Sequence, residues 1–344
     1  MLIKPADLSR IWPWIASLSL GLLLFSLLCS LLFGAVPLSV SQFISWVGGN
    51  DTSQAGLIIE RLRLPRALLA MAVGSILAVS GAATQGLFRN PLADPSLIGV
   101  SAGAAAGASI VIVLLHQWEW GIWGFSLVSV GAFVGSIGVV GFVYSISTNE
   151  QGTRVSTMLL AGIAFTFLAG SITSLLEFVS DNEMLRRLSL WRMGSLDGAN
   201  YQDVMILIAV SVISYLVLFR QHKALNVMLL GESEARHLGI DVKRVKRTII
   251  ISVAAGVGIA VALSGTIAFI GLMVPHLVRL VIGPNHRYLI PLSALLGATL
   301  LVVADIFART LISPTELPVG LVTALLGAPV FLSLLRHRLQ YSFS

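Results

Sequence analysis

Runs of about 20 apolar residues recur along this chain, and they constrain its fold more than any other feature. Such a run can cross the ~30 Å hydrocarbon core of a bilayer as one α-helix, whereas a β-barrel shows alternating segments of about 10 residues. Only 11% of the residues are charged, against about 25% in ordinary soluble domains. The sequence therefore predicts an all-α, polytopic membrane protein with a single transmembrane domain over residues 1–344.

The spans are delimited by glycine, proline and short polar segments. We expect about ten, near residues 12–36, 64–87, 93–115, 121–147, 156–178, 202–219, 246–270, 274–283, 287–311 and 317–335. The eighth is too short to span a bilayer alone and carries Arg279, so it must pack against protein. The first is too long for a signal-peptide core and is expected to stay in the mature protein.

Basic residues predict the orientation. With the N-terminus in the cytoplasm and ten crossings, 14 of the 22 basic residues, including all four lysines, fall inside, as the positive-inside rule favours. The C-terminus is then cytoplasmic too. Arginine pairs with carboxylates bidentately, so the outer arginines suit an acidic partner, although anchoring to lipid headgroups is the alternative. The outer set is Arg61, Arg63, Arg66, Arg186, Arg187, Arg192 and Arg309.

An internal repeat appears when the chain is shifted on itself by 184 residues. Nine identities then fall in a window of 30, and they include Gly74 with Gly258 and Pro91 with Pro275. Five predicted helices separate the two copies, so they enter the membrane from opposite sides. Inverted repeats with matching glycine and proline interruptions are typical of transporters, although small residues also serve simply for close helix packing.

Several classes of chemistry are missing from the sequence. It has no phosphate-binding G-x-x-x-x-G-K-[ST] motif, no Cys/His spacing typical of a metal site and no nucleophile–base–acid set. An ion-coupled transporter would place carboxylates deep in its helices. Here the acidic Asp305 lies near a helix end, with Arg309 one turn away as its expected partner. The chain is thus predicted to be no enzyme, and to take its energy from a separate ATPase rather than an ion gradient.

The longest cytoplasmic connection runs from residue 220 to 247. Within it, GESEARHLGID indicates a short helix with Glu232 and Glu234 near its start and Gly239 at its end. A solvated loop helix is one interpretation. The other is a helix that a cytoplasmic motor protein binds.

Seven stretches of the chain carry motifs that occur together, in this order, in one transporter family. They are RLPRALLAMAVGSILAVSGAATQGLFRNPLADPSLIGVSAGA, LLAGIA, WRMGSL, GESEARHLGI, SGTIAFIGLMVPHLVRLVIGPNHR, ADIFART and ELPVGLVTALLGAPVFLSLL. On these the chain resembles the permease subunits of type II ABC importers, which take up vitamin B12, iron siderophores and haem. The stretches run from residue 63 to 335 and so cover nearly the whole chain.

The resemblance implies the fold and the partners. Such permeases have ten helices with helices 2–5 and 7–10 as inverted repeats, and they work as homodimers in the bacterial inner membrane. Two cytosolic ATPase subunits use ATP and Mg²⁺, a periplasmic binding protein delivers the substrate, and no cofactor, metal or nucleic acid is expected on the chain itself. In relatives, the arginines at the positions of Arg63, Arg66 and Arg309 pair with glutamates of the binding protein. The ATPase coupling segment corresponds to Gly231, Glu232, Ser233, Glu234, Ala235, Arg236, Leu238 and Gly239.

The resemblance is closest to haem importers, on the motif W-x-MGSL-x-GA after an acidic, LR-containing segment. That segment is expected to form a short external helix near residues 183–197, at the mouth of the substrate path. Its Arg186, Arg187 and Arg192 would offer cations to haem propionates, and Met184, Met193 and His116 are candidate contacts for iron. The alternative is that the helix is simply basic at one end and that the methionines only pack. An inner gate is expected by resemblance at Val155, Ser156 and Thr157. Ferric siderophore and vitamin B12 are the alternative substrates.

Overall fold

The computed structural model describes residues 5–49, 54–115, 126–150 and 152–342. Seven helices in it are long and apolar enough to cross a membrane, and three shorter apolar helices supply the other expected spans. The prediction of about ten spans is confirmed. The long helices are α1 (Pro5–Leu32), α4 (Leu64–Leu87), α6 (Leu127–Ser147), α7 (Val155–Val179), α9 (Tyr201–Arg220), α12 (Val242–Ser264) and α14 (His286–Thr310). The three others are α5 (Val100–Leu114), α13 (Ile270–Ile282) and α15 (Val319–Ser342).

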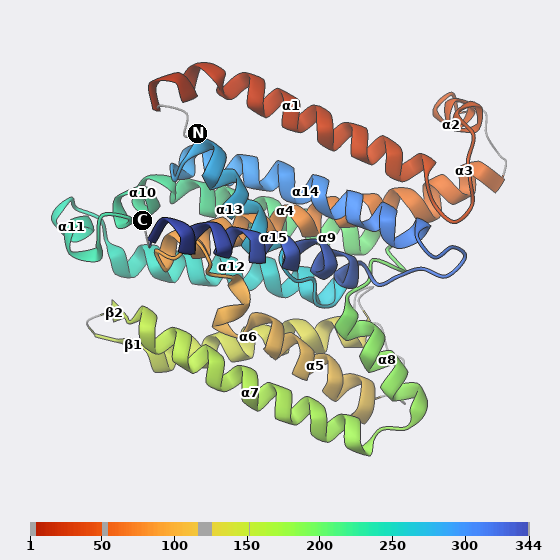
Figure 1. Cartoon of the computed structure of the whole chain (residues 1–344). Coiled ribbons are helices and arrows are strands. Elements are labelled where there is room, and N and C mark those ends of the chain that lie inside the picture. Colours follow the sequence, from red (N-terminus) through yellow and green to blue (C-terminus); the bar gives the residue numbers. More distant parts are fainter. Residues whose placement is uncertain (1–4, 50–53, 116–125, 151, 343–344) are drawn as a thin grey trace.

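Short elements connect these spans. They are α2 (Val40–Val47), α3 (Gln54–Ile58), the π-helical η1 (Ile59–Arg63), the 3-10 helix η2 (Pro95–Ile98), the antiparallel hairpin of β1 (Thr148–Asn149) and β2 (Gly152–Thr153), α8 (Asn182–Met193), α10 (His222–Met228) and α11 (Glu232–His237). Figure 1 shows α2 and α8 at one end of the molecule and α11 with the hairpin at the other. Segments predicted to be cytoplasmic thus share one end.

Several predicted boundaries were wrong, and the structure explains four of them. Helix α1 ends at Leu32 rather than at residue 36, because Arg63 donates hydrogen bonds to the carbonyls of Leu31 and Leu32 and so caps its last turn. The third span is α-helical only from Val100, because the left-handed Gly99 (φ 85°) separates η2 from α5.

The seventh span starts earlier and ends earlier than expected. The Asp241 side chain accepts a hydrogen bond from the Arg244 backbone N–H and caps α12 at Val242. The helix ends at Ser264 because Gly265 has a positive φ of 67°. In the fourth span, the predicted start at residue 121 lies outside the described residues.

The centre of the fold consists of α4, α12 and α14. In these helices 83%, 67% and 56% of the most apolar window is buried inside the chain, against 22% in α1, α6 and α7. Figure 1 shows α1 on one side of the central helices and α5, α6 and α7 on the other. The outer helices therefore present mostly apolar side chains outward, where lipid or another transmembrane chain can cover them.

The two halves pack reciprocally. Helix α4 contacts α13 and α14, and α12 contacts α5 and α6. The first helix of each repeat thus lies against the second and third helices of the other, as the predicted inverted repeat requires. Gly81 and Gly74 on α4 allow close approaches to the second repeat, since a methyl group on Gly81 would overlap the carbonyl oxygen of Gly271 and one on Gly74 that of Gly297. Small residues let these backbones touch.

Candidate functional site

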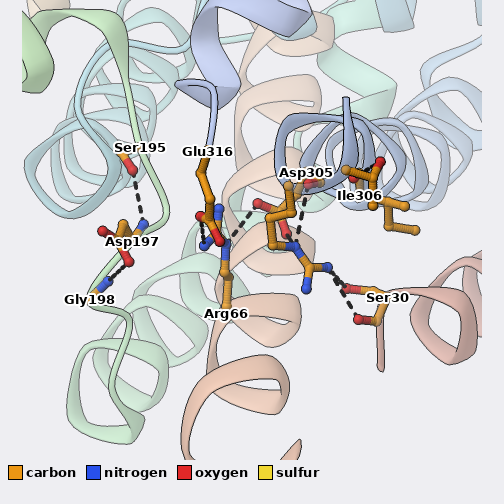
Figure 2. Close-up of polar contacts among 10 residues, drawn as sticks. Ser30, Arg66, Ser195, Asp197, Gly198, Asp305, Ile306 and Glu316 are labelled. Atoms are coloured by element: carbon orange, nitrogen blue, oxygen red, sulfur yellow. Dashed lines mark hydrogen bonds and ion pairs between the residues drawn. The ribbon is translucent and has the colours of Figure 1, made fainter. Parts of the chain in front are cut away.

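An arginine cluster lies at the predicted outer end of the helices. Arg66 lies at the start of α4, and its Nε is 2.9 Å from Oδ1 of Asp305 on α14. Its Nη1 is 2.5 Å from Oε2 of Glu316. Arg309 reaches the other oxygen of Asp305 at 3.0 Å, which confirms the expected pair one turn apart. Figure 2 shows Arg66 between Glu316 and Asp305, with Ser30 of α1 on the far side. We call Arg63, Arg66, Asp305, Arg309 and Glu316 the outer arginine cluster.

The remaining contacts tie the cluster to the end of α1. Arg63 donates to the backbone carbonyls of Leu31, Leu32 and Val36. Arg309 donates to the Ser30 hydroxyl at 2.8 Å. A carbon on Gly34 would lie 2.9 Å from a nitrogen of Arg63 and 3.3 Å from one of Arg309, so the turn after α1 brings its backbone against both guanidinium groups.

The structure brings the three predicted docking arginines together and also buries them. Arg63, Arg66 and Arg309 are 5%, 8% and 4% exposed, and each is held by internal acceptors. They nevertheless line one cavity of about 260 Å³, together with Glu316 and Asp197. A partner's carboxylate would therefore reach them through this cavity rather than on an open surface. Arg61, outside the family motif, is exposed.

Helix α8 carries the residues predicted for the substrate path. Asp181 caps it, accepting a hydrogen bond from the Met184 backbone N–H, and Gly194 (φ 74°) ends it, so it is shorter than the expected 183–197. Arg186 and Arg187 line a cavity of about 890 Å³ with Trp191, next to the last turn of α12. Met193 is 47% exposed and is not among the residues that line this cavity. His116 lies outside the described residues.

Helix α11 forms where GESEARHLGI predicted it. Gly231 (φ 132°) precedes it and Gly239 (φ 81°) follows it, and both backbone conformations suit glycine. Within the helix, Ala235 is fully buried. The side chains of Ser233, Glu234, Arg236 and Leu238 are exposed, so a projecting surface with both charge signs is available to a partner. Glu232 points the other way, to Lys246 at 2.6 Å.

The predicted gate residues occupy the first turn of α7, directly after the β1–β2 hairpin. Thr148 and Thr153 pair across the hairpin, and the Arg154 backbone N–H donates to the Ser147 carbonyl at 2.9 Å. Val155 and Ser156 line a cavity of about 590 Å³ that Glu232 and Lys246 also line, whereas Thr157 does not line it. The predicted gate and the coupling segment thus share one cavity.

Among the residues that the structure describes, no group of three or more His, Cys, Asp or Glu side chains is arranged to hold a metal ion. The most strongly organised polar features are instead the outer arginine cluster and the contacts around α11.

Comparison with known proteins decides the family. Residues 22–337 match the FecCD transport family. The chain belongs to this family of importer permeases. Members of this family are the membrane-spanning subunits of ABC importers, and ATP hydrolysis belongs to a separate subunit of such an assembly.

Individual relatives align with most of this chain. The hemin transport system permease HmuU of Yersinia pestis is 43% identical, over 94% of this chain and 97% of the relative. The cobalamin import permease BtuC of Halobacterium salinarum is 45% identical, over 85% of this chain and 76% of the relative. A solved inward-facing transporter described as metal-chelate type superposes with a TM-score of 0.83 at 31% identity, over 94% of this chain and 99% of that one.

Sequence reasoning missed two contacts within the candidate sites. Glu316 lies in the recognised motif ELPVG, but nothing in that motif indicated that it would pair with Arg66, 250 residues away in the chain. Lys246 counted only as one of several cytoplasmic cations, although it is 3% exposed. Its position next to buried Val245 and Ile249 on the apolar face of α12 was the available signal.

Proposed function

We propose that this permease passes haem from a periplasmic binding protein across the inner membrane, as a homodimer driven by two cytoplasmic ATPase subunits. The observation that supports haem as the substrate is the cavity of about 890 Å³ at the predicted outer end. Haem combines a flat apolar ring with two propionates, so it needs apolar or aromatic walls with cations at one edge. Leu190 and Trp191 supply such walls, and Arg186 and Arg187 supply two cations on the same helix. Three carboxylates, Asp197, Asp203 and Glu316, also line the cavity, so the propionates would have to lie on the α8 side. The similarity to HmuU over nearly its whole length supports the same substrate.

Cobalamin is the second candidate, because the BtuC relative is as similar in sequence. A ferric siderophore is a third, within the same family. Cobalamin carries amides rather than carboxylates around its ring, so it gains less from paired arginines. Replacing Arg186 and Arg187 by glutamine should therefore weaken haem transport more than cobalamin transport.

The substrate experiment uses the complete complex in proteoliposomes, with its ATPase subunits and binding protein. ATP-driven uptake of haem, ferric siderophore and cobalamin is measured side by side, and haem is expected to be accumulated fastest. Faster uptake of either other compound would overturn the haem assignment. Permease alone under a proton or sodium gradient tests the ion-coupled alternative, and no uptake is expected there.

For the outer arginine cluster we propose a docking role, in which a carboxylate of the binding protein enters the 260 Å³ cavity and competes with Glu316 for Arg66. Glu316 is the replaceable partner, since its side chain is 36% exposed whereas that of Asp305 is fully buried. Several charge pairs of this kind fix register and speed association more than they add affinity.

Arg63 offers the cleanest docking test, because its hydrogen bonds to the α1 end go to neutral carbonyls rather than to Asp305. We expect Arg63→Gln to weaken binding-protein-stimulated ATP hydrolysis severalfold, while the exposed Arg61→Gln leaves it unchanged. Equal effects of the two substitutions would contradict docking at this cluster.

A further inference from the structure

Lys246 is a buried cation inside an otherwise exposed basic segment. Its side chain is 3% exposed, whereas Lys243, Arg244 and Arg247 on the same helix are exposed. Removing an ammonium group from water is costly unless it is paired and hydrogen-bonded. A buried ion pair is also weak evidence for a stabilising role, because apolar replacements are often as stable. The position of Lys246 therefore calls for another explanation.

The contacts of Lys246 join three separate parts of the chain. Its Nζ lies 2.6 Å from a carboxylate oxygen of Glu232, the first residue of α11. The same Nζ donates a hydrogen bond of 2.7 Å to the backbone carbonyl of Thr153 in β2. Lys246 itself belongs to the second turn of α12. One ammonium group thus links the predicted coupling helix to the hairpin that precedes the predicted gate.

The hairpin is built to transmit a displacement to α7. The hydroxyls of Thr148 and Thr153 lie 2.9 Å apart, and the Arg154 N–H is bonded to the Ser147 carbonyl. The Arg154 carbonyl then accepts from the Met158 N–H at 3.0 Å, in the first turn of α7. A pull on the Thr153 carbonyl therefore acts on a hydrogen-bonded unit that continues into α7.

The surroundings leave room for that displacement. A cavity of about 590 Å³ and another of about 230 Å³ are both lined by Lys246, Glu232 and Thr153. Three further cations, Arg89, Arg154 and Arg236, line the larger one, so Glu232 lies in a positive field. If α11 moves and Glu232 stays paired with Lys246, the Lys246 ammonium group must move with it. The Thr153 carbonyl, which accepts a hydrogen bond from that group, must then move as well.

We propose that Lys246 is a positioning residue that couples α11 to the gate end of α7, through its simultaneous contacts with Glu232 and the Thr153 carbonyl. The proposal rests on the ABC importer function and specifies how a push on α11 reaches the translocation path.

The test compares Lys246→Met with the matched control Lys243→Met, on the exposed face of the same helix. Methionine matches the lysine side chain up to Cε but removes the ammonium group, and with it the charge and the donors. Glu232 is 27% exposed and can be hydrated, so the variant is expected to assemble. In proteoliposomes with ATPase subunits and binding protein, the ratio of substrate imported to ATP hydrolysed is measured. It should fall at least tenfold in Lys246→Met, with ATP hydrolysis within about twofold of the original, and stay unchanged in Lys243→Met.

Lys246→Arg provides the rescue, since a guanidinium group can donate to both partners and the flanking cavities have space for it. It should restore the ratio to within about threefold. An unchanged ratio in Lys246→Met would overturn the proposal, as would equal losses in Lys246→Met and Lys243→Met. If the unsubstituted complex itself shows no ATP-dependent uptake, the importer function fails instead, so the two failures are distinguishable.

A second measurement applies even if Lys246→Met lowers assembly. In a Cys29→Ser background, the substitution Ser156→Cys reports the accessibility of the predicted gate through its rate of thiol labelling. Addition of ATP should change that rate in the otherwise unsubstituted complex but not with Glu232→Gln, which retains the shape of the side chain. An ATP-dependent change that persists with Glu232→Gln would overturn the coupling role.

Discussion

Replacing Asp305 by asparagine should destabilise this permease strongly, because one carboxylate serves two buried guanidinium groups. Asp305 is fully buried and contacts Arg66 at 2.9 Å and Arg309 at 3.0 Å. Asparagine retains the shape but carries no charge and presents an amide nitrogen to one of the arginines. Arg66 still has Glu316, whereas Arg309 retains only neutral acceptors such as Ser30.

The magnitude follows from that burial. Removing one partner of a buried ion pair costs about 3–5 kcal/mol, since the remaining charge stays desolvated. The matched substitution Glu316→Gln removes the other acid of the cluster, but its side chain is 36% exposed and Arg66 keeps Asp305. Because Glu316 can be hydrated and buried Arg66 keeps the Asp305 counter-charge, this loss should stay near the ~1 kcal/mol upper value of exposed pairs. The two substitutions should therefore differ by several kcal/mol, although each removes one negative charge.

The assay is reversible unfolding of the purified permease in mixed detergent micelles, followed by tryptophan fluorescence, with the free energy of unfolding extrapolated to native conditions. A loss below about 1 kcal/mol for Asp305→Asn would refute the assignment of Asp305 as the shared, essential counter-charge. Equal losses for Asp305→Asn and Glu316→Gln would refute the argument from burial.

Three further outcomes are expected. Gly81→Ala should cost about 1–3 kcal/mol or more in unfolding free energy, because the added methyl group would overlap the Gly271 carbonyl. The control Gly138→Ala should be neutral, because nothing lies within 4 Å of its new carbon. Similar losses in the two variants would contradict a backbone contact between α4 and α13. Arg192→Ala should cost no more than ~1 kcal/mol in the same assay, since its 2.5 Å pair with Glu177 is 52% and 32% exposed. Removal of Mg²⁺, or replacement of ATP by a non-hydrolysable analogue, should abolish uptake by the complete complex; continued uptake would show that energy comes from elsewhere.

The sequence by itself determined the membrane-spanning architecture. A bilayer offers no hydrogen-bond partners, so each apolar run must satisfy its backbone internally as a helix. The length of the run then fixes the span. That is why the predicted 64–87 coincides with α4 and 156–178 differs from α7 by one residue at each end. Errors arose where a distant side chain or a left-handed glycine ended a helix, as Arg63 does for α1 and Gly99 does before α5.

Motifs likewise assigned the candidate sites to particular segments of the chain, but they did not reveal the environment of those residues. The outer arginines were expected at the surface for docking. Burial depends on which helices meet, and α1, α4 and α14 converge on Arg66 and Arg309 only in three dimensions. Within this cluster, the sequence correctly predicted the local pair of Asp305 and Arg309, which lie one helical turn apart.

Only the tertiary structure decided which distant residues contact each other at each end of the molecule. Thr153 and Lys246 are 93 residues apart, and Arg66 and Glu316 are 250 apart. Periodicity and motif spacing describe neighbours within one helix. These contacts arise because the two repeats pack reciprocally and bring helix ends from both halves together.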